Sequence, residues 1–242
     1  YGQKMNALPT SMTIGIKGVE ETLEEAKAYA DLGFKVFKVK TGMDVLEDIE
    51  RIKALYTSFG KDCTIRVDAN QGYDLDQLKL FLKATSNYPL ELIEQPLPVG
   101  KEQVLLQLNA AERKCLTADE ALKDPQAALH LAAGEHAFGI YNIKLMKCGG
   151  LLGAKEIATI AQHAGIDLFW GCNDESIISI TAALHIAKGL SGIFTFATVF
   201  QILPTGLRDF IYDYVARNRY KWYGKKEACM IPTPELKGKF LE

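Results

Sequence analysis

One series of charged residues recurs along this chain at a nearly constant interval of about 25 to 28 positions. In chain order its members are Lys40, Asp68, Glu94, Asp119 and Lys144. Each closes or follows a short apolar segment of the kind that forms a β-strand, and a second lysine, Lys38, precedes Lys40 by two positions. An interval of this length holds one strand, one helix and two loops, so these side chains should occupy equivalent places on neighbouring strands.

The three acids in the middle of the series suit a metal ion. Asp68, Glu94 and Asp119 would repel one another if they met at one point without a cation among them. A ligand set of carboxylate oxygens without His or Cys favours a hard divalent ion, and three such ligands leave room for substrate on Mg²⁺. Any one of these acids alone is explained as an ordinary loop residue. Their joint spacing with the lysines favours a magnesium site.

The lysines at the two ends of the series suit proton transfer. On the second and sixth strands of a barrel, Lys40 and Lys144 would face each other with the acids between them. Removing an α-proton from a carboxylate gives an enediolate with two negative charges, which a divalent ion bound to both oxygens stabilises. A lysine must be neutral to act as the base, and we expect burial, the metal ion and Lys38 to lower its pKa. If one lysine takes a proton from one face and the other returns one to the opposite face, the reaction is racemisation or epimerisation.

Strand-like and helix-like segments alternate along most of the chain. We expect strands at residues 11–16, 34–40, 64–69, 90–94, 116–118, 139–144, 167–171 and 193–199. We expect helices at residues 19–32, 45–56, 75–85, 103–109, 125–133, 151–164 and 176–188. This alternation implies parallel strands joined by right-handed crossovers.

The expected fold class is α/β, as a TIM-type (β/α)8 barrel or a modified (β/α)7β barrel. Such a barrel gathers its chemistry at the C-terminal ends of its strands. The rival is a doubly wound open sheet, which would reverse its strand order midway and scatter the charged series to both sides. We expect the barrel domain to span residues 1–200. Residues 201–242 are richer in Tyr, Arg, Lys and Pro, and we expect them to pack on the barrel or on an absent cap.

Composition narrows the class of protein. The 242 residues are 48% hydrophobic and 24% charged, which fits a globular domain with a large core. The net charge of −2 disfavours nucleic-acid binding, and the five widely spaced cysteines fit thiols in a reducing compartment. No apolar segment reaches the roughly 18 residues of a membrane helix, so we expect a cytoplasmic protein that binds no membrane. Because the chain begins with Tyr1, a fragment of a longer protein is also expected.

Together, these residues resemble the enolase superfamily, in its muconate-lactonising subgroup, across roughly residues 10 to 200. The matching motifs are Lys38-Val39-Lys40, Asp68, Glu94-Gln95-Pro96, Ala118-Asp119-Glu120, and Lys144 with Gly149-Gly150. The resemblance implies that Lys40 and Lys144 are the acid/base pair, that Lys38 is an electrostatic neighbour, and that the three acids bind Mg²⁺. Lysine bases with Mg²⁺ are an established arrangement in enolase-type sites.

Residues 171–176 and 180–185 are similar to the seventh-strand region of the dipeptide epimerases, such as L-Ala-D/L-Glu epimerase. The resemblance implies substrate contacts from Glu175, Asp174 and Asn70. Two features depart from that pattern. Residues 194–200 contain no Asp-x-Asp pair of the kind that holds a substrate ammonium group, and nothing before Ser11 corresponds to the N-terminal α+β capping domain of the family.

The expected function is that of an Mg²⁺-dependent isomerase, an epimerase or racemase of dipeptides or N-acyl amino acids that moves an α-proton between two lysines. Two alternatives use the same scaffold, cycloisomerisation and o-succinylbenzoate synthesis. A third is a truncated barrel that binds metal without turnover. The expected partner is a small-molecule carboxylate substrate. The sequence leaves open whether the chain forms a homo-oligomer.

Overall fold

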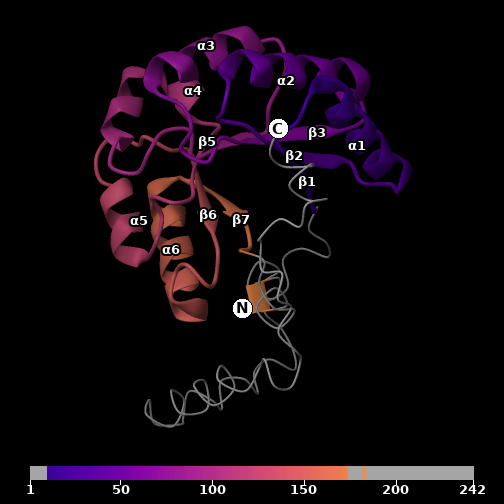
Figure 1. Ribbon diagram of the computed structural model, residues 1–242. Coiled ribbons are helices and arrows are strands. Elements are labelled where there is room, and N and C mark those ends of the chain that lie inside the picture. The colour runs from indigo at the N-terminus through magenta and orange to yellow at the C-terminus, as the bar shows by residue number, and fades with distance from the viewer. Residues whose placement is uncertain (1–9, 174–181, 184–242) are drawn as a thin grey trace, which may run out of the picture. The chain divides into compact units, whose positions relative to one another are not determined.

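The computed structural model describes residues 10–173 and 182–183, all of which belong to one compact unit, Ala7–Ala187. Seven strands of this unit form a single parallel sheet in the order of the chain (Figure 1). The strands are β1 (Met12–Ile14), β2 (Val36–Lys40), β3 (Thr64–Asp68), β4 (Leu92–Glu94), β5 (Leu116–Ala118), β6 (Ile140–Ile143) and β7 (Asp167–Trp170). Each is one of the strands expected from the sequence.

The sheet has the topology of a barrel wall. Every strand pairs in parallel with the next strand of the chain, so the reversal that defines a doubly wound sheet is absent from these seven strands. The sheet also curves strongly. The curvature brings the guanidinium carbon of Arg66 on β3 within 4.9 Å of the ring centroid of Phe169 on β7. The α/β barrel prediction is therefore confirmed for these strands. The eighth expected strand, 193–199, lies outside the described residues.

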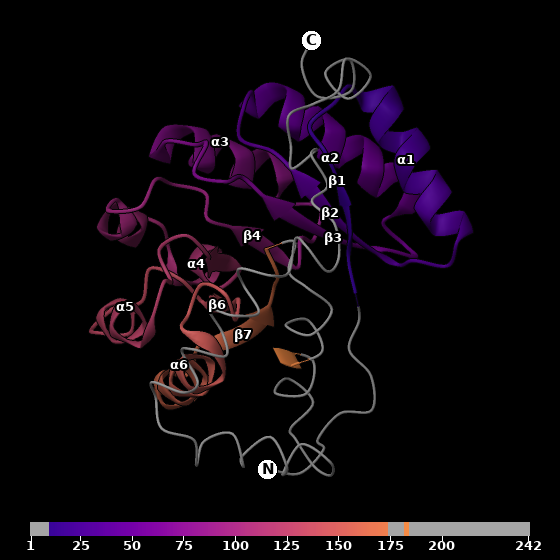
Figure 2. The same ribbon diagram turned by 60° about the horizontal axis from the view of Figure 1, so that its bottom comes forward.

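Helices cover the convex face of this sheet, and its concave face is turned away from them (Figures 1 and 2). They are α1 (Val19–Asp31), α2 (Val45–Phe59), α3 (Leu75–Thr85), the 3₁₀-helix η1 (Glu102–Gln107), α4 (Ala110–Arg113), α5 (Pro125–Leu131) and α6 (Gly150–Ala164). Asp44, Asp74 and Asp124 begin α2, α3 and α5 by accepting hydrogen bonds from backbone N–H groups of the first turn. Apart from residues 182 and 183, the expected helix 176–188 lies outside the described residues.

One expected helix, at residues 103–109, is wrong in its form. The segment is the 3₁₀-helix η1, and a separate short helix, α4, follows it. Leu108 and Asn109 both have extended backbone angles, which ends the first turn. Asn109 then starts a new helix through a capping box: the Asn109 side chain accepts from the Glu112 N–H, and the Glu112 side chain accepts from the Asn109 N–H.

Strand alternation turns the lysines of β2 toward the concave face. Phe37 and Val39 are fully buried in the core that the helices share, whereas Lys38 and Lys40 lie on the other face of the strand. The register then aligns the charged series, because Lys40 pairs with Asp68 and Asp68 pairs with Glu94. These three residues therefore stand at one height on neighbouring strands.

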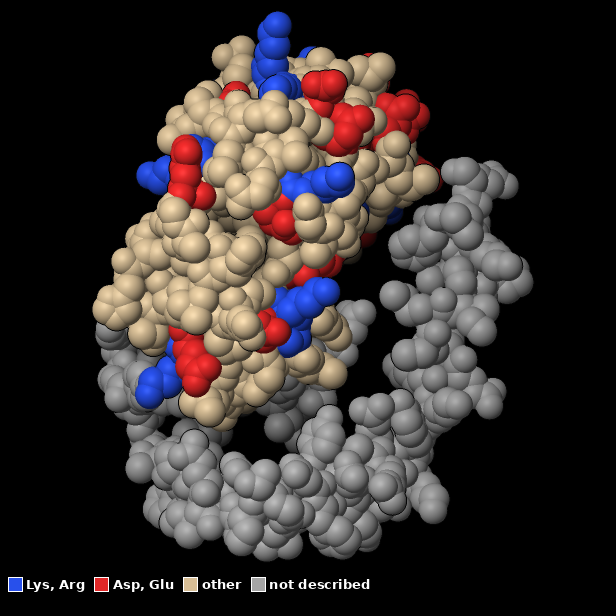
Figure 3. Space-filling view, turned by 90° about the vertical axis from the view of Figure 1, so that its left-hand side faces the viewer, with Lys and Arg blue, Asp and Glu red and all other residues tan. Residues whose placement is uncertain are grey.

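Two expectations about the surface concern the described residues. In the part of the chain that the structure describes, no helix combines the length and apolar character needed to cross a membrane. Among the described residues visible in Figure 3, positive and negative side chains are interspersed and do not gather into one basic patch. The predicted domain boundary at residue 200 lies outside the described residues and stays a prediction.

Candidate active site

The two lysines of β2 contact acids from the next two strands. The Nζ atoms of Lys38 and Lys40 both lie 2.8 Å from Asp68 Oδ2. Lys38 Nζ also lies 2.7 Å from Glu94 Oε2 on β4, so this one ammonium group bridges two carboxylates. Lys40 Nζ donates a second hydrogen bond to Asn70 Oδ1 at 2.6 Å.

Two further lysines contact the acid that follows β5. Lys144 Nζ lies 2.5 Å from Asp119 Oδ2 and 3.7 Å from Glu94 Oε1. Lys147 pairs with the other carboxylate oxygen of Asp119 and donates to the carbonyl oxygens of Asp119, at 2.5 Å, and Asn142, at 3.3 Å. Lys147 was not predicted from the sequence. Its spacing of three residues from Lys144, one turn of chain after β6, is the signal that would have found it.

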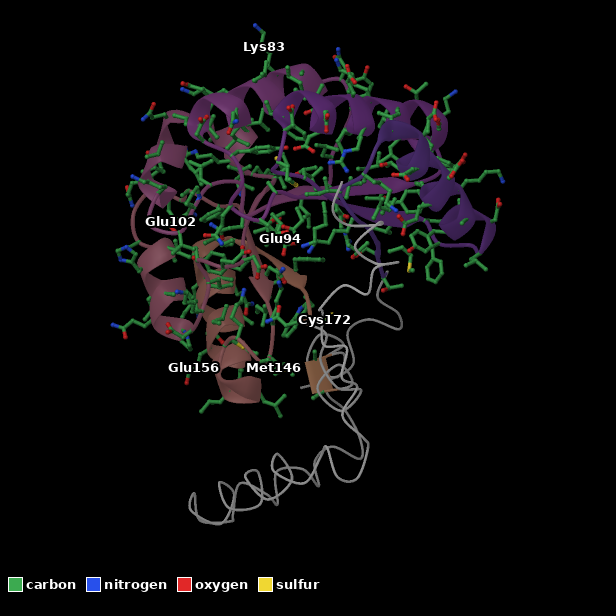
Figure 4. All side chains as sticks on the ribbon, in the orientation of Figure 1. Lys83, Glu94, Glu102, Met146, Glu156 and Cys172 are labelled. Atoms are coloured by element: carbon green, nitrogen blue, oxygen red, sulfur yellow. The ribbon has the colours of Figure 1, made fainter. Side chains whose placement is uncertain are left out.

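These contacts form one alternating series of ammonium and carboxylate groups along the strand ends from β2 to β6. In order it runs Lys40, Asp68, Lys38, Glu94, Lys144, Asp119 and Lys147. The three acids are almost completely buried, which is tolerated only when the charges are paired. Figure 4 shows Glu94 inside the curve of the sheet, whereas Lys83 and Glu156 project from the outer helices. The structure thus brings together all six residues of the predicted catalytic and metal sets.

Burial and neighbouring charges shift the acids in opposite directions. Burial raises the pKa of Glu94 to about 7, and although Lys38 opposes this, the negative charges of Asp68 and Asp119 add to it. Burial alone would also raise the pKa of Asp119. Contact with Glu94 and the ammonium groups of Lys147 and Lys144 instead lowers it to about 2. The middle of the series is therefore an acid whose charged form is destabilised first by burial and then by the neighbouring carboxylates.

The pKa of Lys144 is raised in this arrangement, whereas the sequence predicted a lowering for an acid/base lysine beside a metal ion, and the pKa of Lys38 is raised as well. Burial does lower the pKa of each, but for Lys38 the charges of Glu94 and Asp68 outweigh it and raise the pKa. Asp119 and Glu94 do the same for Lys144, even though Lys38 opposes them. The physical reason is that unneutralised carboxylates hold the ammonium form. The pKa of Lys147 is lowered, because burial outweighs Asp119 there.

The three acids fit Mg²⁺ by the chemistry of their donor atoms. All are buried carboxylates on neighbouring strands, and Glu94 Oε2 already has a cation, the Lys38 ammonium group, at 2.7 Å. Among the described residues, no three His, Cys, Asp or Glu side chains converge closely enough to hold a metal ion as they stand. Lys38 instead contacts both Asp68 and Glu94. The assignment of the three acids as metal ligands therefore stays a prediction.

The predicted substrate contacts of Asp174, Glu175 and Asn70 are not tested by the structure. Asp174 and Glu175 lie outside the described residues. Asn70 lies at the mouth of the site, where it accepts from Lys40 and its amide nitrogen donates to Glu120 Oε1 at 3.1 Å. Its contact with a substrate is untested and stays a prediction.

Two side-chain amides in the site were missed by sequence reasoning. Asn142 donates to Glu94 Oε1 at 2.8 Å, and its position two residues before Lys144 on β6 is the signal that places it on the same face. Gln95 is buried with a left-handed φ of 33°. Its Oε1 accepts from the backbone N–H groups of Asp119, at 3.0 Å, and Ala121, at 3.1 Å. Gln95 therefore fixes the loop that carries Asp119.

Comparison with known proteins finds an enolase-type domain and relatives that are epimerases. A family model described as "Enolase C-terminal domain-like" matches residues 21–219. An L-Lys-D/L-Arg epimerase of Methylococcus capsulatus is 52% identical over 186 residues, which cover 77% of this chain and 52% of that protein. An L-amino acid-D/L-Glu epimerase of Francisella philomiragia is 34% identical over 242 residues, 98% of this chain and 64% of that protein.

The same resemblance extends to a solved structure. A dipeptide epimerase from Methylococcus capsulatus, complexed with Mg and the dipeptide L-Arg-D-Lys, matches with a TM-score of 0.75 and 52% sequence identity. The match covers 77% of this chain and 52% of that chain. This chain spans about half the length of the first curated relatives that it matches.

Proposed function

Because the chain belongs to the enolase C-terminal domain-like family, we propose that it carries the catalytic site of an Mg²⁺-dependent dipeptide epimerase. The observation that carries this proposal is the alternating series of ion pairs along the strand ends. It puts Lys40 on β2 and Lys144 after β6, with three buried carboxylates from β3, β4 and the end of β5 between them. Two such groups on opposite sides of a carbon can take a proton from one face and return one to the other.

Each charged group has a role in this reaction. Asp68, Glu94 and Asp119 would hold Mg²⁺, which when bound stabilises the negative charge that develops on the substrate carboxylate. One of Lys40 and Lys144 takes the α-proton at its Nζ, and the other delivers a proton from its Nζ to the opposite face. Lys38, which lies between Asp68 and Glu94, would add the positive charge of its ammonium group beside the reacting carbon.

The substrate class follows from the relatives. At 52% identity, the L-Lys-D/L-Arg epimerase supports dipeptides of basic amino acids as the class to test first. N-acyl amino acids are the second class, because they offer the same α-proton beside a carboxylate. In cycloisomerisation and o-succinylbenzoate synthesis, the same site would use one lysine as the base and the other to stabilise the enolate.

The test is hydrogen exchange at the α-carbon. The purified protein is incubated with Mg²⁺ in D₂O and a library of L,L- and L,D-dipeptides and N-acyl amino acids, and deuterium uptake is measured by mass spectrometry. We expect uptake into both epimers of a dibasic dipeptide. Lys144→Ala should abolish epimerisation, whereas Lys83→Ala, an exposed lysine on α3, should leave the rate unchanged. Absence of uptake from every library member would overturn the proposal.

A further inference from the structure

A buried polar cluster lies outside the alternating series and is formed by Asp48, Arg51 and Tyr73. Asp48 and Arg51 lie one turn apart on α2 and form an ion pair with each other. The hydroxyl of Tyr73, in the loop after β3, donates to Asp48 Oδ2 at 2.7 Å. All three residues are at most 2% exposed.

The cluster holds the backbone on both sides of the end of β2. Arg51 Nη2 donates to the carbonyl oxygen of Lys40 at 2.9 Å. Two residues later, the backbone N–H of Gly42 donates to Asp48 Oδ2 at 2.8 Å. Between them, the Thr41 N–H donates to the carbonyl oxygen of Asp68 at 2.9 Å. The backbone that follows Lys40 is thus fixed by α2 on one side and by β3 on the other.

The turn at Gly42 leaves little freedom for this arrangement to shift. Gly42 has a φ of 103°, in the left-handed region, and a Cβ atom there would lie 2.2 Å from the carbonyl oxygen of Ala69. The segment after β2 therefore packs directly on the segment after β3. A displacement of the cluster would move the backbone at Lys40, because Gly42 packs too closely on Ala69 for the turn to absorb the displacement.

Stability alone is a weak reason for such a cluster. A buried ion pair contributes little net stability compared with well-packed apolar side chains, because both charges lose their hydration. Here the hydrogen-bonding groups of Asp48 and Arg51 are used on particular atoms of the strand end that carries Lys40. Such an arrangement can serve catalysis by fixing the position of a reacting group to within a fraction of an ångström.

We propose that Asp48, Arg51 and Tyr73 form a positioning cluster that holds the strand end at Lys40 and thereby aims the Lys40 amine at one face of the substrate carbon. This inference rests on the proposed function, because it takes Lys40 as one of two groups that exchange the α-proton. It assigns no contact with substrate to the cluster. Its consequence is one-sided, since Lys144 is carried by a different strand end.

The test compares two tyrosine variants that lose the same group. Tyr73→Phe removes the hydroxyl bonded to Asp48, and Tyr141→Phe removes an equally buried hydroxyl that donates to the Ala128 carbonyl oxygen at 3.0 Å. Lys40→Ala first identifies which epimer of the dipeptide depends on Lys40 for deuterium exchange. We expect Tyr73→Phe to slow exchange of that epimer about tenfold, and exchange of the other epimer less than about twofold. Tyr141→Phe should change both by less than about twofold.

A second variant and a second readout separate the possible failures. Arg51→Lys keeps the charge but loses the planar donor pair, and we expect the same one-sided loss. In protein labelled with ¹⁵N at lysine Nζ, Tyr73→Phe should shift the Lys40 resonance, assigned with Lys40→Ala, and leave that of Lys144 in place. Equal slowing of both epimers, or an unshifted Lys40 resonance, would overturn the inference. If the unsubstituted protein exchanges neither epimer, the proposed function fails, and the resonance shift still tests the positioning.

Discussion

Gly171, directly after β7, is the position where a single methyl group should disturb Lys144 most directly. A Cβ atom added there would lie 2.5 Å from Asn142 Oδ1 and 2.9 Å from Lys144 Cε. Both distances are shorter than any normal contact, and both neighbours belong to the site. Gly171→Ala should therefore displace the Lys144 side chain and the amide of Asn142 that bonds to Glu94.

The size of the effect follows from these distances. Relaxation to a normal carbon contact of about 3.5 to 4.0 Å requires Lys144 Cε to retreat by roughly 0.6 to 1.1 Å. A misplacement of about 1 Å of a reacting group lowers the rate by up to roughly 100-fold. We therefore expect a 10- to 100-fold fall in kcat, equivalent to about 1.4 to 2.7 kcal/mol in the activation barrier.

The assay is α-deuterium exchange of each dipeptide epimer, measured separately. The loss should fall mainly on the epimer whose exchange is abolished in Lys144→Ala, while the other epimer keeps most of its rate. Gly18→Ala is a suitable control, because a Cβ atom at Gly18 has no neighbour within 4 Å and its φ is not left-handed. An unchanged rate in Gly171→Ala, with the fold intact by circular dichroism, would refute the argument that Lys144 acts from this position.

Three further predictions concern the acids and the groups that hold them. Lys147→Met should lower the free energy of unfolding by about 1 to 3 kcal/mol, measured by urea denaturation, because it breaks the ion pair with Asp119 but leaves Asp119 paired with Lys144. As a control, Lys83→Ala should change the free energy of unfolding by less than about 0.5 kcal/mol. Gln95→Met should lower the free energy of unfolding by about 2 to 5 kcal/mol, since two buried backbone N–H groups lose their acceptor. A decrease below about 1 kcal/mol in the same urea denaturation would contradict this. Mg²⁺ at 100 times its Kd should stabilise the protein by about 2.7 kcal/mol, or roughly 5 to 10 °C in Tm, and Glu94→Gln should remove most of that shift; an equal shift in both proteins would exclude Glu94 as a ligand.

Strand alternation and regular spacing were enough to predict which charged residues meet. Lys38 and Lys40 lie two apart on one strand, so alternation alone puts both on the face opposite Phe37. Parallel strands with equal connections then bring Asp68 and Glu94 level with Lys40. These inferences succeed because period and register are properties of the backbone that the sequence pattern carries directly.

The parts that could not be predicted depend on side chains that reach between elements. Arg51 and Asp48 lie on the buried stripe of α2, where a charged pair in a sequence is normally taken for a solvent-exposed one. Lys147 meets Asp119 from 28 positions away because the chain turns back after β6. The direction of the Lys144 pKa shift depends on how closely two acids approach its Nζ, which spacing does not state. Each of these is a matter of distance between elements, and no periodicity encodes it.

Different contacts fix the backbone at Lys40 and at Asp119, near the two ends of the alternating series. Substitutions in these contacts should therefore have different effects on the reaction. At the Lys40 end, a cluster on an outer helix fixes the strand end from behind. At the Asp119 end, Gln95 keeps a left-handed backbone, a conformation that costs a residue other than glycine about 1 kcal/mol or more. Gln95 tolerates it because its side chain accepts from the Asp119 loop and its backbone N–H donates to the Thr117 carbonyl oxygen of β5 at 2.8 Å. The strands set the height of the charges, and these loop and helix contacts hold the strand ends and loops that carry them. Substitutions in these loop and helix contacts should therefore change the relative exchange rates of the two dipeptide epimers and the affinity for Mg²⁺ while the fold is retained.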